Sequence, residues 1–201
     1  MTTKHQVVEQ FRCRAIREAA MRVVSRKGLA KATVEDIARE AGVAKGTVYL
    51  YFRSRHEILE KTIGAAVDDL LDRLRRAAEG TSPFAEALER LLAAQFAFFD
   101  ENRDFFRLYF ASGEYSEDRR LRQSCRYRLH IDQLAALIRA GRRRGELKGL
   151  DPERAAIAIA GASRDLILRR IHEKQPPSPG ADARFLRDVL VSGLSAGRGK
   201  A

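Results

Sequence analysis

Apolar residues recur every three or four positions along most of the chain, which is the spacing of an α-helix that buries one face. The first such stripe precedes Gly28 and consists of Val8, Phe11, Ala15, Ile16, Ala19, Val23 and Val24. Runs in which apolar and polar residues alternate, the period of a half-buried strand, are nearly absent. The pattern therefore predicts an all-α protein of about nine helices, without internal repeats.

Capping residues predict where several of these helices begin. Thr33 precedes the apolar run of a second helix, and Ser54 with Glu57 three residues later has the pattern of a capping box. Ser82-Pro83 and Asp151-Pro152 each join a capping side chain to a proline that suits the first helical turn. Glycines predict helix ends at positions 28, 42, 80 and 141.

The same pattern divides the chain into a small head and a larger body. Three helices over residues 1–53 form the head, which has the helix-turn-helix layout described below, and a helical bundle over residues 54–201 forms the body. In the body, a short aromatic helix is expected at 103–111 and a long one from Ser116 to Gly141. A last amphipathic helix is expected from Ala181 to Leu194, after a proline-rich loop.

Positive charge is concentrated in the head. The whole chain has a net charge of +11, with 38 Lys and Arg against 27 Asp and Glu. Residues 1–55 alone hold 12 Lys and Arg against five Asp and Glu. This asymmetry is compatible with a module for a polyanion such as nucleic acid, or with a solvated surface that aids solubility.

Several other classes of protein are disfavoured by what the sequence lacks. The longest apolar run, at 155–162, is far shorter than the roughly 20 residues of a membrane span, and no apolar stretch follows Met1 as in a secretory signal. Two cysteines are too few for a disulfide scaffold. The four histidines form no metal-binding pair, and no phosphate-binding glycine loop or nucleophile motif is present. We therefore expect a soluble, cytoplasmic protein that is not an enzyme and uses no metal, cofactor or membrane partner.

Residues 33–53 have the layout of a helix-turn-helix. A capped helix ends at the turn of Gly42, and a second short helix starts about three residues later. Val48 and Phe52 lie four residues apart, so both can pack inward against the first helix. The outer faces of the second helix then carry Lys45, Gly46, Thr47, Tyr49, Leu50 and Tyr51. A cation, a hydroxyl and two phenols suit contacts with phosphates and base edges.

This segment is similar to the DNA-binding domain of the tetracycline-repressor (TetR) family of bacterial transcriptional regulators. The similarity runs from about Arg14 to Leu59. It is carried by Thr33-Val34-Glu35-Asp36-Ile37-Ala38, Ala41-Gly42-Val43, Lys45-Gly46-Thr47-Val48-Tyr49 and Tyr51-Phe52. The resemblance implies a three-helix head followed by an all-helical body that binds a ligand and dimerises.

The resemblance also implies which residues contact operator DNA. Thr33 and Arg55 would bind phosphates, and Gly46 would let the backbone approach the duplex closely. The remaining implied contacts to phosphates and the groove are Lys45, Thr47, Tyr49 and Tyr51. The segment departs from the family pattern in two places. Ala44 lacks the capping hydroxyl of a serine, and Leu50-Tyr51 stands where an aromatic residue and a histidine are frequent. Leu50 can touch a thymine methyl group but cannot hydrogen-bond a base, so the operator sequence does not follow by analogy.

Aromatic residues gather in the middle of the chain. Ten of the 15 Phe and Tyr residues lie between Phe84 and Tyr127. This density is compatible with a plain core or with a cavity for an apolar or planar ligand, and the resemblance implies an inducer pocket in this region. The candidate ligand-binding residues are Phe96, Phe99, Phe106, Tyr109, Phe110, Tyr127 and His130.

The last two helices carry small and apolar faces. Residues 155–163 are rich in alanine, and Leu186, Val189 and Leu190 form a stripe on the final helix. Both patterns are compatible with packing inside one chain, or with the dimer interface that the resemblance implies. A dimer matters because a two-fold pair of helix-turn-helix motifs reads two half-sites about one helical turn apart.

The sequence thus predicts a TetR-like regulator, a repressor in the common case, that binds double-stranded operator DNA as a homodimer. A small apolar or aromatic effector would release it, by tilting the helix that joins the head to the body. The alternatives are a DNA-organising protein without a ligand and, less favoured by the motifs, an all-helical enzyme.

Overall fold

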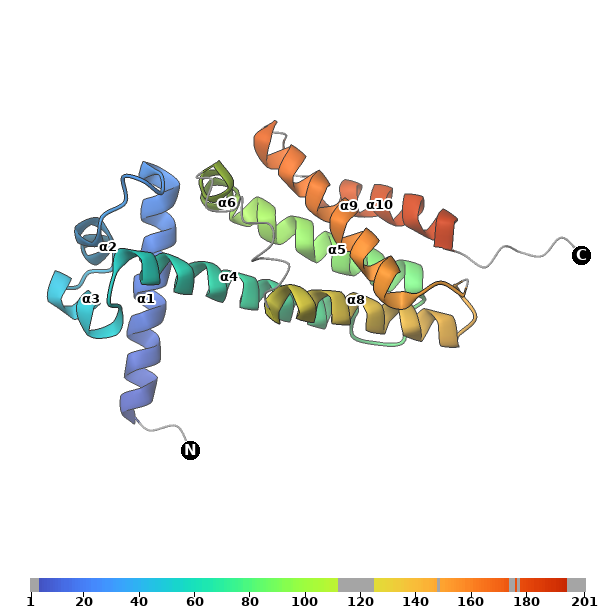
Figure 1. Cartoon of the computed structure of the whole chain (residues 1–201), viewed down its shortest axis with the longest axis horizontal. Helices are drawn as coiled ribbons and strands as arrows, with labels where there is room; N and C mark the ends of the chain where they lie inside the picture. Colours follow the sequence, from blue (N-terminus) through green and yellow to red (C-terminus); the bar gives the residue numbers. More distant parts are fainter. Residues whose placement is uncertain (1–3, 112–124, 148, 174–175, 177, 195–201) are drawn as a thin grey trace, which may run out of the picture. The chain divides into compact units, whose positions relative to one another are not determined.

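The computed structural model describes residues 4–111, 125–147, 149–173, 176 and 178–194. In this part of the chain the helices are α1 (Lys4–Lys27), α2 (Val34–Glu40), α3 (Lys45–Tyr51), α4 (Arg55–Ala78), α5 (Phe84–Glu101), α6 (Arg103–Ala111), α8 (Cys125–Arg143), α9 (Pro152–His172) and α10 (Pro179–Leu194). The predicted all-α architecture is confirmed (Figure 1).

The helices group into two compact units. Unit 1 comprises residues 1–67 and 104–116, and unit 2 comprises residues 68–103 and 117–201. Helix α4 therefore contributes residues to both units. The functional boundary between residues 53 and 54 stays a prediction.

Unit 1 is built around one buried face of α1. Ile16 and Val24 of this helix are fully buried, together with Ile37 of α2. Val48 of α3 is 0% exposed and Phe52, directly after α3, is 4% exposed. The predicted inward packing of Val48 and Phe52 is confirmed, and it decides which face of α3 meets solvent.

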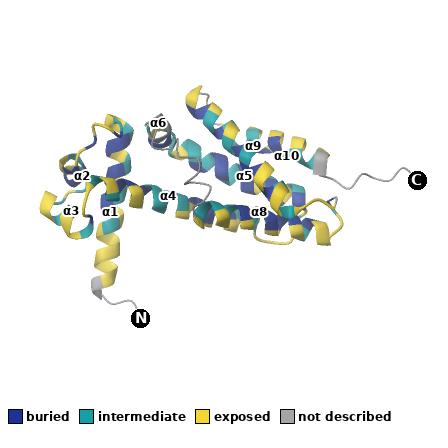
Figure 2. Cartoon of the chain, in the orientation of Figure 1, coloured by how far each residue is buried: buried dark blue, intermediate teal, exposed yellow. Residues whose placement is uncertain are grey.

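The first turns of α1 differ from the predicted apolar stripe. Val8 and Phe11 expose 50% and 69% of their surface, and every residue from Gln6 to Arg12 is exposed (Figure 2). The buried contacts of α1 begin only at Ile16, so helical spacing alone does not place these first residues in a core.

Unit 2 contains the larger core. Helix α5 packs against α10, and α8 packs against α9. Buried residues follow the whole length of α5: Phe84, Ala87, Leu88, Leu91, Leu92, Gln95, Phe96 and Phe98. Burying this many large apolar side chains is the main stabilising contribution to the unit.

Three predicted caps are confirmed. The Thr33 hydroxyl accepts a hydrogen bond from the Asp36 amide (3.1 Å), and the Asp36 carboxylate accepts one from the Thr33 amide (3.4 Å). Asp151 accepts hydrogen bonds from two amides at the start of α9. Ser54 caps α4 through the Glu57 amide (3.1 Å), but the Glu57 carboxylate accepts from the Arg53 amide (2.7 Å) instead of the Ser54 amide.

The predicted cap at Ser82 is wrong. Helix α5 begins at Phe84, and the residue before it, Pro83, supplies no side-chain hydrogen bond. The Phe84 amide instead donates to the Glu146 carboxylate (2.5 Å), which lies 62 residues further along the chain. A distant side chain thus does what the local sequence predicts for Ser82.

Gly141 is not the end of its helix. Helix α8 continues to Arg143, and the turn that follows uses Gly145, whose φ of +74° favours glycine. Gly141 is buried, and a Cβ at this position would lie 3.0 Å from both Leu147 Cδ1 and Phe84 Cβ. Its role is close packing, which helical spacing does not reveal.

Two other predicted boundaries shift or cannot be compared. The expected helix start at Ser116 lies outside the described residues. Within them, α8 begins at Cys125. Helix α10 begins at Pro179, two residues before the expected start at Ala181, because proline is tolerated in a first helical turn. No helix in the described ranges is long and apolar enough to cross a membrane.

Candidate nucleic-acid interface and ligand cleft

Helix α3 presents its polar side to solvent. Leu50 exposes 79% and Tyr49 49% of its surface, whereas Val48, directly before them in the helix, is fully buried. Lys45 and Gly46 are exposed too. Thr47 and Tyr51 are half-buried at the edges of this face, and a Cβ added to Gly46 would meet no atom within 4 Å. The six predicted contacts of α3 therefore lie on or beside one accessible face.

Ion pairs and a tight turn hold α2 and α3 in place. At the turn, the Val43 amide donates to the Ala38 carbonyl (3.0 Å), and Gly42 adopts a φ of +67°. Arg22 and Arg26 of α1 both bind the Glu40 carboxylate at the end of α2. These contacts tie the helix-turn-helix to α1, so the exposed face of α3 is carried on a stable support.

Lys45 already has an anionic partner on the protein. Its ammonium pairs with the Glu35 carboxylate in the first turn of α2, and its Nζ lies 5.9 Å from the centre of the Tyr49 ring. The hydrogen bond between Lys45 and Glu35 lowers the pKa of Glu35 and raises the pKa of Lys45. Both groups are therefore charged at neutral pH.

Thr33 and Arg55 have structural partners. The Thr33 hydroxyl caps α2 by accepting a hydrogen bond from the Asp36 amide. The Arg55 guanidinium donates to the carbonyls of Leu29 and Ala32, the latter at 2.6 Å, and so fastens the loop between α1 and α2. The phosphate contacts of Thr33 and Arg55 stay predictions. The contacts that the structure gives Arg55 are those that hold the loop.

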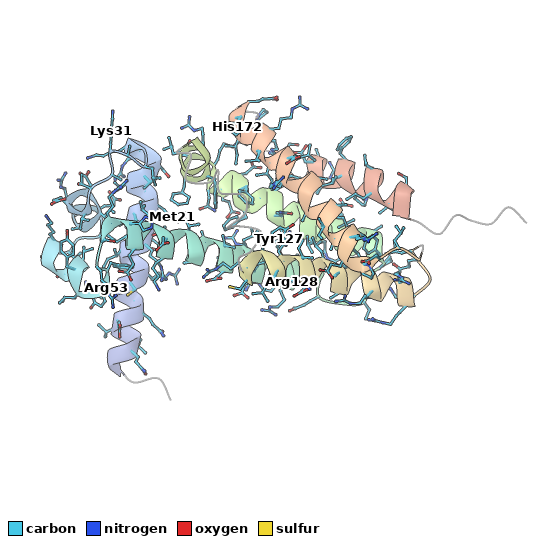
Figure 3. All side chains as sticks on the ribbon, viewed as in Figure 1. Met21, Lys31, Arg53, Tyr127, Arg128 and His172 are labelled. Atoms are coloured by element: carbon cyan, nitrogen blue, oxygen red, sulfur yellow. The ribbon has the colours of Figure 1, made fainter. Side chains whose placement is uncertain are left out.

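Two exposed cations of the head were not among the predicted contacts. Lys31 lies in the loop before α2 and Arg53 directly after α3 (Figure 3), and no carboxylate in the described ranges pairs with either side chain. The sequence could have indicated these two residues only by their position, because each is a basic residue within two positions of a predicted contact or helix end.

The sequence of the head matches a known family. Residues 16–62 fit the family of bacterial regulatory proteins named tetR. An uncharacterised helix-turn-helix transcriptional regulator of Bacillus subtilis, YfiR, is 31% identical over 140 residues, which cover 68% of each chain. The regulator TtgR of Pseudomonas putida is 32% identical over 163 residues, which cover 76% of each chain.

The chain belongs to the TetR family. The predicted resemblance is thereby confirmed, and the protein is a transcriptional regulator with a DNA-binding helix-turn-helix, not an enzyme. The structure of FadR from Bacillus subtilis, solved with stearoyl-CoA, has the same fold. It matches this TetR-family chain with a TM-score of 0.76 and 24% identity, covering 90% of this chain and 98% of FadR.

The predicted ligand residues fall in both units of the regulator. Phe96 and Phe106 are buried core residues of unit 2 and unit 1, respectively. Phe99 packs edge-on against Phe98 at 5.6 Å between ring centres, and Tyr127 is half-buried on α8 (Figure 3). The side chains of Tyr109 and Phe110 lie outside the described residues. Their roles in ligand binding stay predictions.

His130 is half-buried, and its two ring nitrogens have no polar partner within the described residues. Both ring nitrogens are inaccessible and lack hydrogen bonds within the described residues. Burial lowers the pKa of His130 to about 4, so the ring is neutral at neutral pH. A neutral imidazole with both nitrogens unpaired can offer one hydrogen-bond donor and one acceptor to a bound molecule.

Unit 2 also contains a cleft of about 280 Å³. It is lined by Arg75, Ala78, Glu79, Gly80, Ser82, Ala87, Gln133, Ala136, Leu137, Ala140 and Arg144. Gln133 donates its amide to the Leu71 carbonyl (3.2 Å), while its buried Oε1 has no partner in the described residues. None of the five predicted ligand residues whose side chains are described lines this cleft, whose walls contain no aromatic side chain among those described.

Proposed function

We propose that this TetR-family regulator is a cytoplasmic repressor that binds operator DNA as a homodimer through α3 and leaves it when a small apolar molecule binds unit 2. The exposed face of α3 is the observation that carries the proposal. A short helix with one buried apolar side and one polar accessible side is the form in which a helix-turn-helix enters the major groove.

Electrostatics supports the same face. Lys45 lies on it and Arg53 follows α3 directly, and residues 1–55 carry most of the excess positive charge of the chain. Contacts between such cations and phosphates release counterions, which makes binding favourable and dependent on salt. Thr47, Tyr49 and Leu50 would then read base edges and thymine methyl groups.

Replacing Lys45 with alanine should weaken binding to every DNA sequence by roughly five-fold and reduce the salt dependence by about one charge. The operator is first recovered as genomic DNA that the protein pulls down, and affinity is then measured by fluorescence anisotropy over a salt series. Lys61→Ala, which removes an exposed cation from α4, is the matched control. If Lys45→Ala behaves like Lys61→Ala, α3 is not the DNA-binding helix.

The effector would combine an apolar body with one hydrogen-bonding group. FadR of Bacillus subtilis, which shares the fold, was solved with stearoyl-CoA, in which a long apolar acyl chain is joined to a polar CoA group. The cleft of unit 2 offers apolar walls from Ala87, Ala136 and Leu137 and an unpaired acceptor at Gln133 Oε1. An apolar lining with a few convergent polar atoms is the usual form of a small-molecule site.

4-Hydroxybiphenyl is a suitable probe, since its rings suit the apolar walls and its hydroxyl can donate to Gln133. We expect it to bind the protein in a calorimetric titration and to release operator DNA. Gln133→Leu, which keeps the volume and removes the acceptor, should weaken this binding about ten-fold. Stearoyl-CoA serves as the second probe. If it releases operator DNA equally well from the parent protein and from Gln133→Leu, the effector binds outside the cleft.

The mechanism proposed for release is a two-state one. Helix α4 contributes residues to unit 1, which holds α3, and to unit 2, which holds the cleft. An effector that favours the state unable to bind DNA by about 1–3 kcal/mol would weaken operator binding about 5- to 150-fold. The homodimer is proposed to form through α9 and α10, and its test is the first prediction of the Discussion.

A further inference from the structure

Two neighbouring acids at the start of α2 have different surroundings. The Asp36 side chain is 11% exposed, closes the capping box with Thr33 and pairs with Lys27 at 2.6 Å. Glu35 is 52% exposed and its carboxylate binds Lys45 of α3. Asp36 therefore holds the head together, whereas Glu35 stands on the surface that carries the proposed DNA contacts.

The position of Glu35 is unusual for a surface that approaches DNA. The residue lies two positions after Thr33, a proposed phosphate contact, and its partner Lys45 is another. Tyr49, a third proposed contact, has its ring centre 5.9 Å from Lys45 Nζ. A carboxylate at this place adds negative charge where phosphates would approach, and it occupies the ammonium that a phosphate needs.

We propose that Glu35 competes with DNA phosphates for Lys45 and so lowers the affinity of the regulator for DNA of any sequence. This inference rests on the proposed function of α3. The pair is half-exposed on both sides, and ion pairs so accessible to water open easily. Lys45 can therefore exchange Glu35 for a phosphate, and each exchange leaves the carboxylate unpaired beside the duplex.

The consequence is a brake on non-specific binding. Affinity for random DNA comes almost entirely from cations that neutralise phosphates, and the head of this chain carries a large excess of them. Pairing Lys45 within the protein removes one effective cation from that excess. Base contacts from residues such as Thr47 are unaffected, because Glu35 touches none of them through any contact found in the described residues.

Glu35→Gln is the direct test, because it removes the charge while keeping the size of the side chain. We expect affinity for a short random-sequence duplex to rise roughly five-fold at low salt, with a salt dependence steeper by about one charge. Operator affinity should rise as well. Glu18→Gln is the matched control, since Glu18 pairs with Arg14 on α1 and its loss changes the net charge equally. It should leave affinity within about two-fold of the parent.

A double-mutant cycle decides whether Glu35 acts through Lys45. In a Lys45→Ala background the gain from Glu35→Gln should fall to less than half. An equal gain in both backgrounds would overturn the inference, because Glu35 would then act by general repulsion. A loss of affinity in Glu35→Gln would also overturn it, since Glu35 would then be a residue that positions Lys45 for DNA.

The same data separate this inference from the proposed function. If Lys45→Ala weakens DNA binding and Glu35→Gln does not strengthen it, the inference fails while α3 keeps its role. If the protein binds its operator and neither substitution changes that affinity, the assignment of α3 itself fails. Circular dichroism of each variant checks that α2 remains folded.

Discussion

Phe185→Asp should convert the regulator into a monomer and lower its operator affinity by at least about 100-fold. Phe185 and Val189 lie one turn apart on α10 and expose 59% and 54% of their surface. Ile157 of α9 exposes 46%. Apolar side chains this exposed on two neighbouring helices are typical of a surface that a second copy covers. An aspartate placed in such an interface leaves a charge buried and unpaired.

The small-residue face of α9 supports the same interface. Ala156, Ala160 and Ser163 are buried within the chain, whereas Ala158 is exposed and a Cβ on Gly161 would meet no atom within 4 Å. The face thus divides into an inner part that packs in unit 2 and an outer part open to another helix. Intramolecular packing and dimerisation, which the sequence left as alternatives, would use different residues of the same helix.

Analytical ultracentrifugation measures the oligomeric state of Phe185→Asp, and an electrophoretic mobility shift measures its operator affinity. Leu129→Asp is the matched control, because Leu129 is 52% exposed and belongs to α8, which is not one of the two helices proposed to form the interface. We expect this control to remain a dimer. A dimeric Phe185→Asp with unchanged operator affinity would place the interface elsewhere.

Arg170→Ala should lower the free energy of unfolding by about 3 kcal/mol. The Arg170 side chain is 6% exposed and binds two carboxylates, Asp100 of α5 at 2.7 Å and Asp182 of α10. Its guanidinium also lies 5.8 Å from the centre of the Phe96 ring. Removing the cation takes away one of two guanidinium partners of Asp100, which is 13% exposed and also pairs with Arg103 at 2.6 Å, and it takes away a partner of Asp182.

Arg169→Ala is the control for this loss. Arg169 is the preceding residue of α9, is 64% exposed and pairs only one turn away with Glu173. Its removal should change stability by less than about 0.5 kcal/mol. Urea unfolding followed by far-ultraviolet circular dichroism gives both values, and the chain has no tryptophan to report by fluorescence. Equal losses in the two variants would mean that the Arg170 network contributes nothing beyond an exposed pair.

Much of the candidate DNA-binding face follows from local sequence. The cap at Thr33, the turn at Gly42 and the inward spacing of Val48 and Phe52 depend on residues close together in the chain. Once Val48 faces inward, the geometry of a helix places Tyr49 and Leu50 outside. For this reason the accessible side of α3 could be predicted from the sequence, whereas the ligand-binding residues stay predictions.

The amino-acid sequence by itself determined the helical class, most helix ends, the polar side of α3 and the family, because each depends on periodicity, caps or a continuous motif. Tertiary structure decided the partners of side chains: Arg55 on the loop carbonyls, Glu146 on the start of α5, and Arg170 between two aspartates. The physical reason is distance along the chain. Helical periodicity says which side of a helix is buried, but not which side chain from 62 or 70 residues away will meet it there.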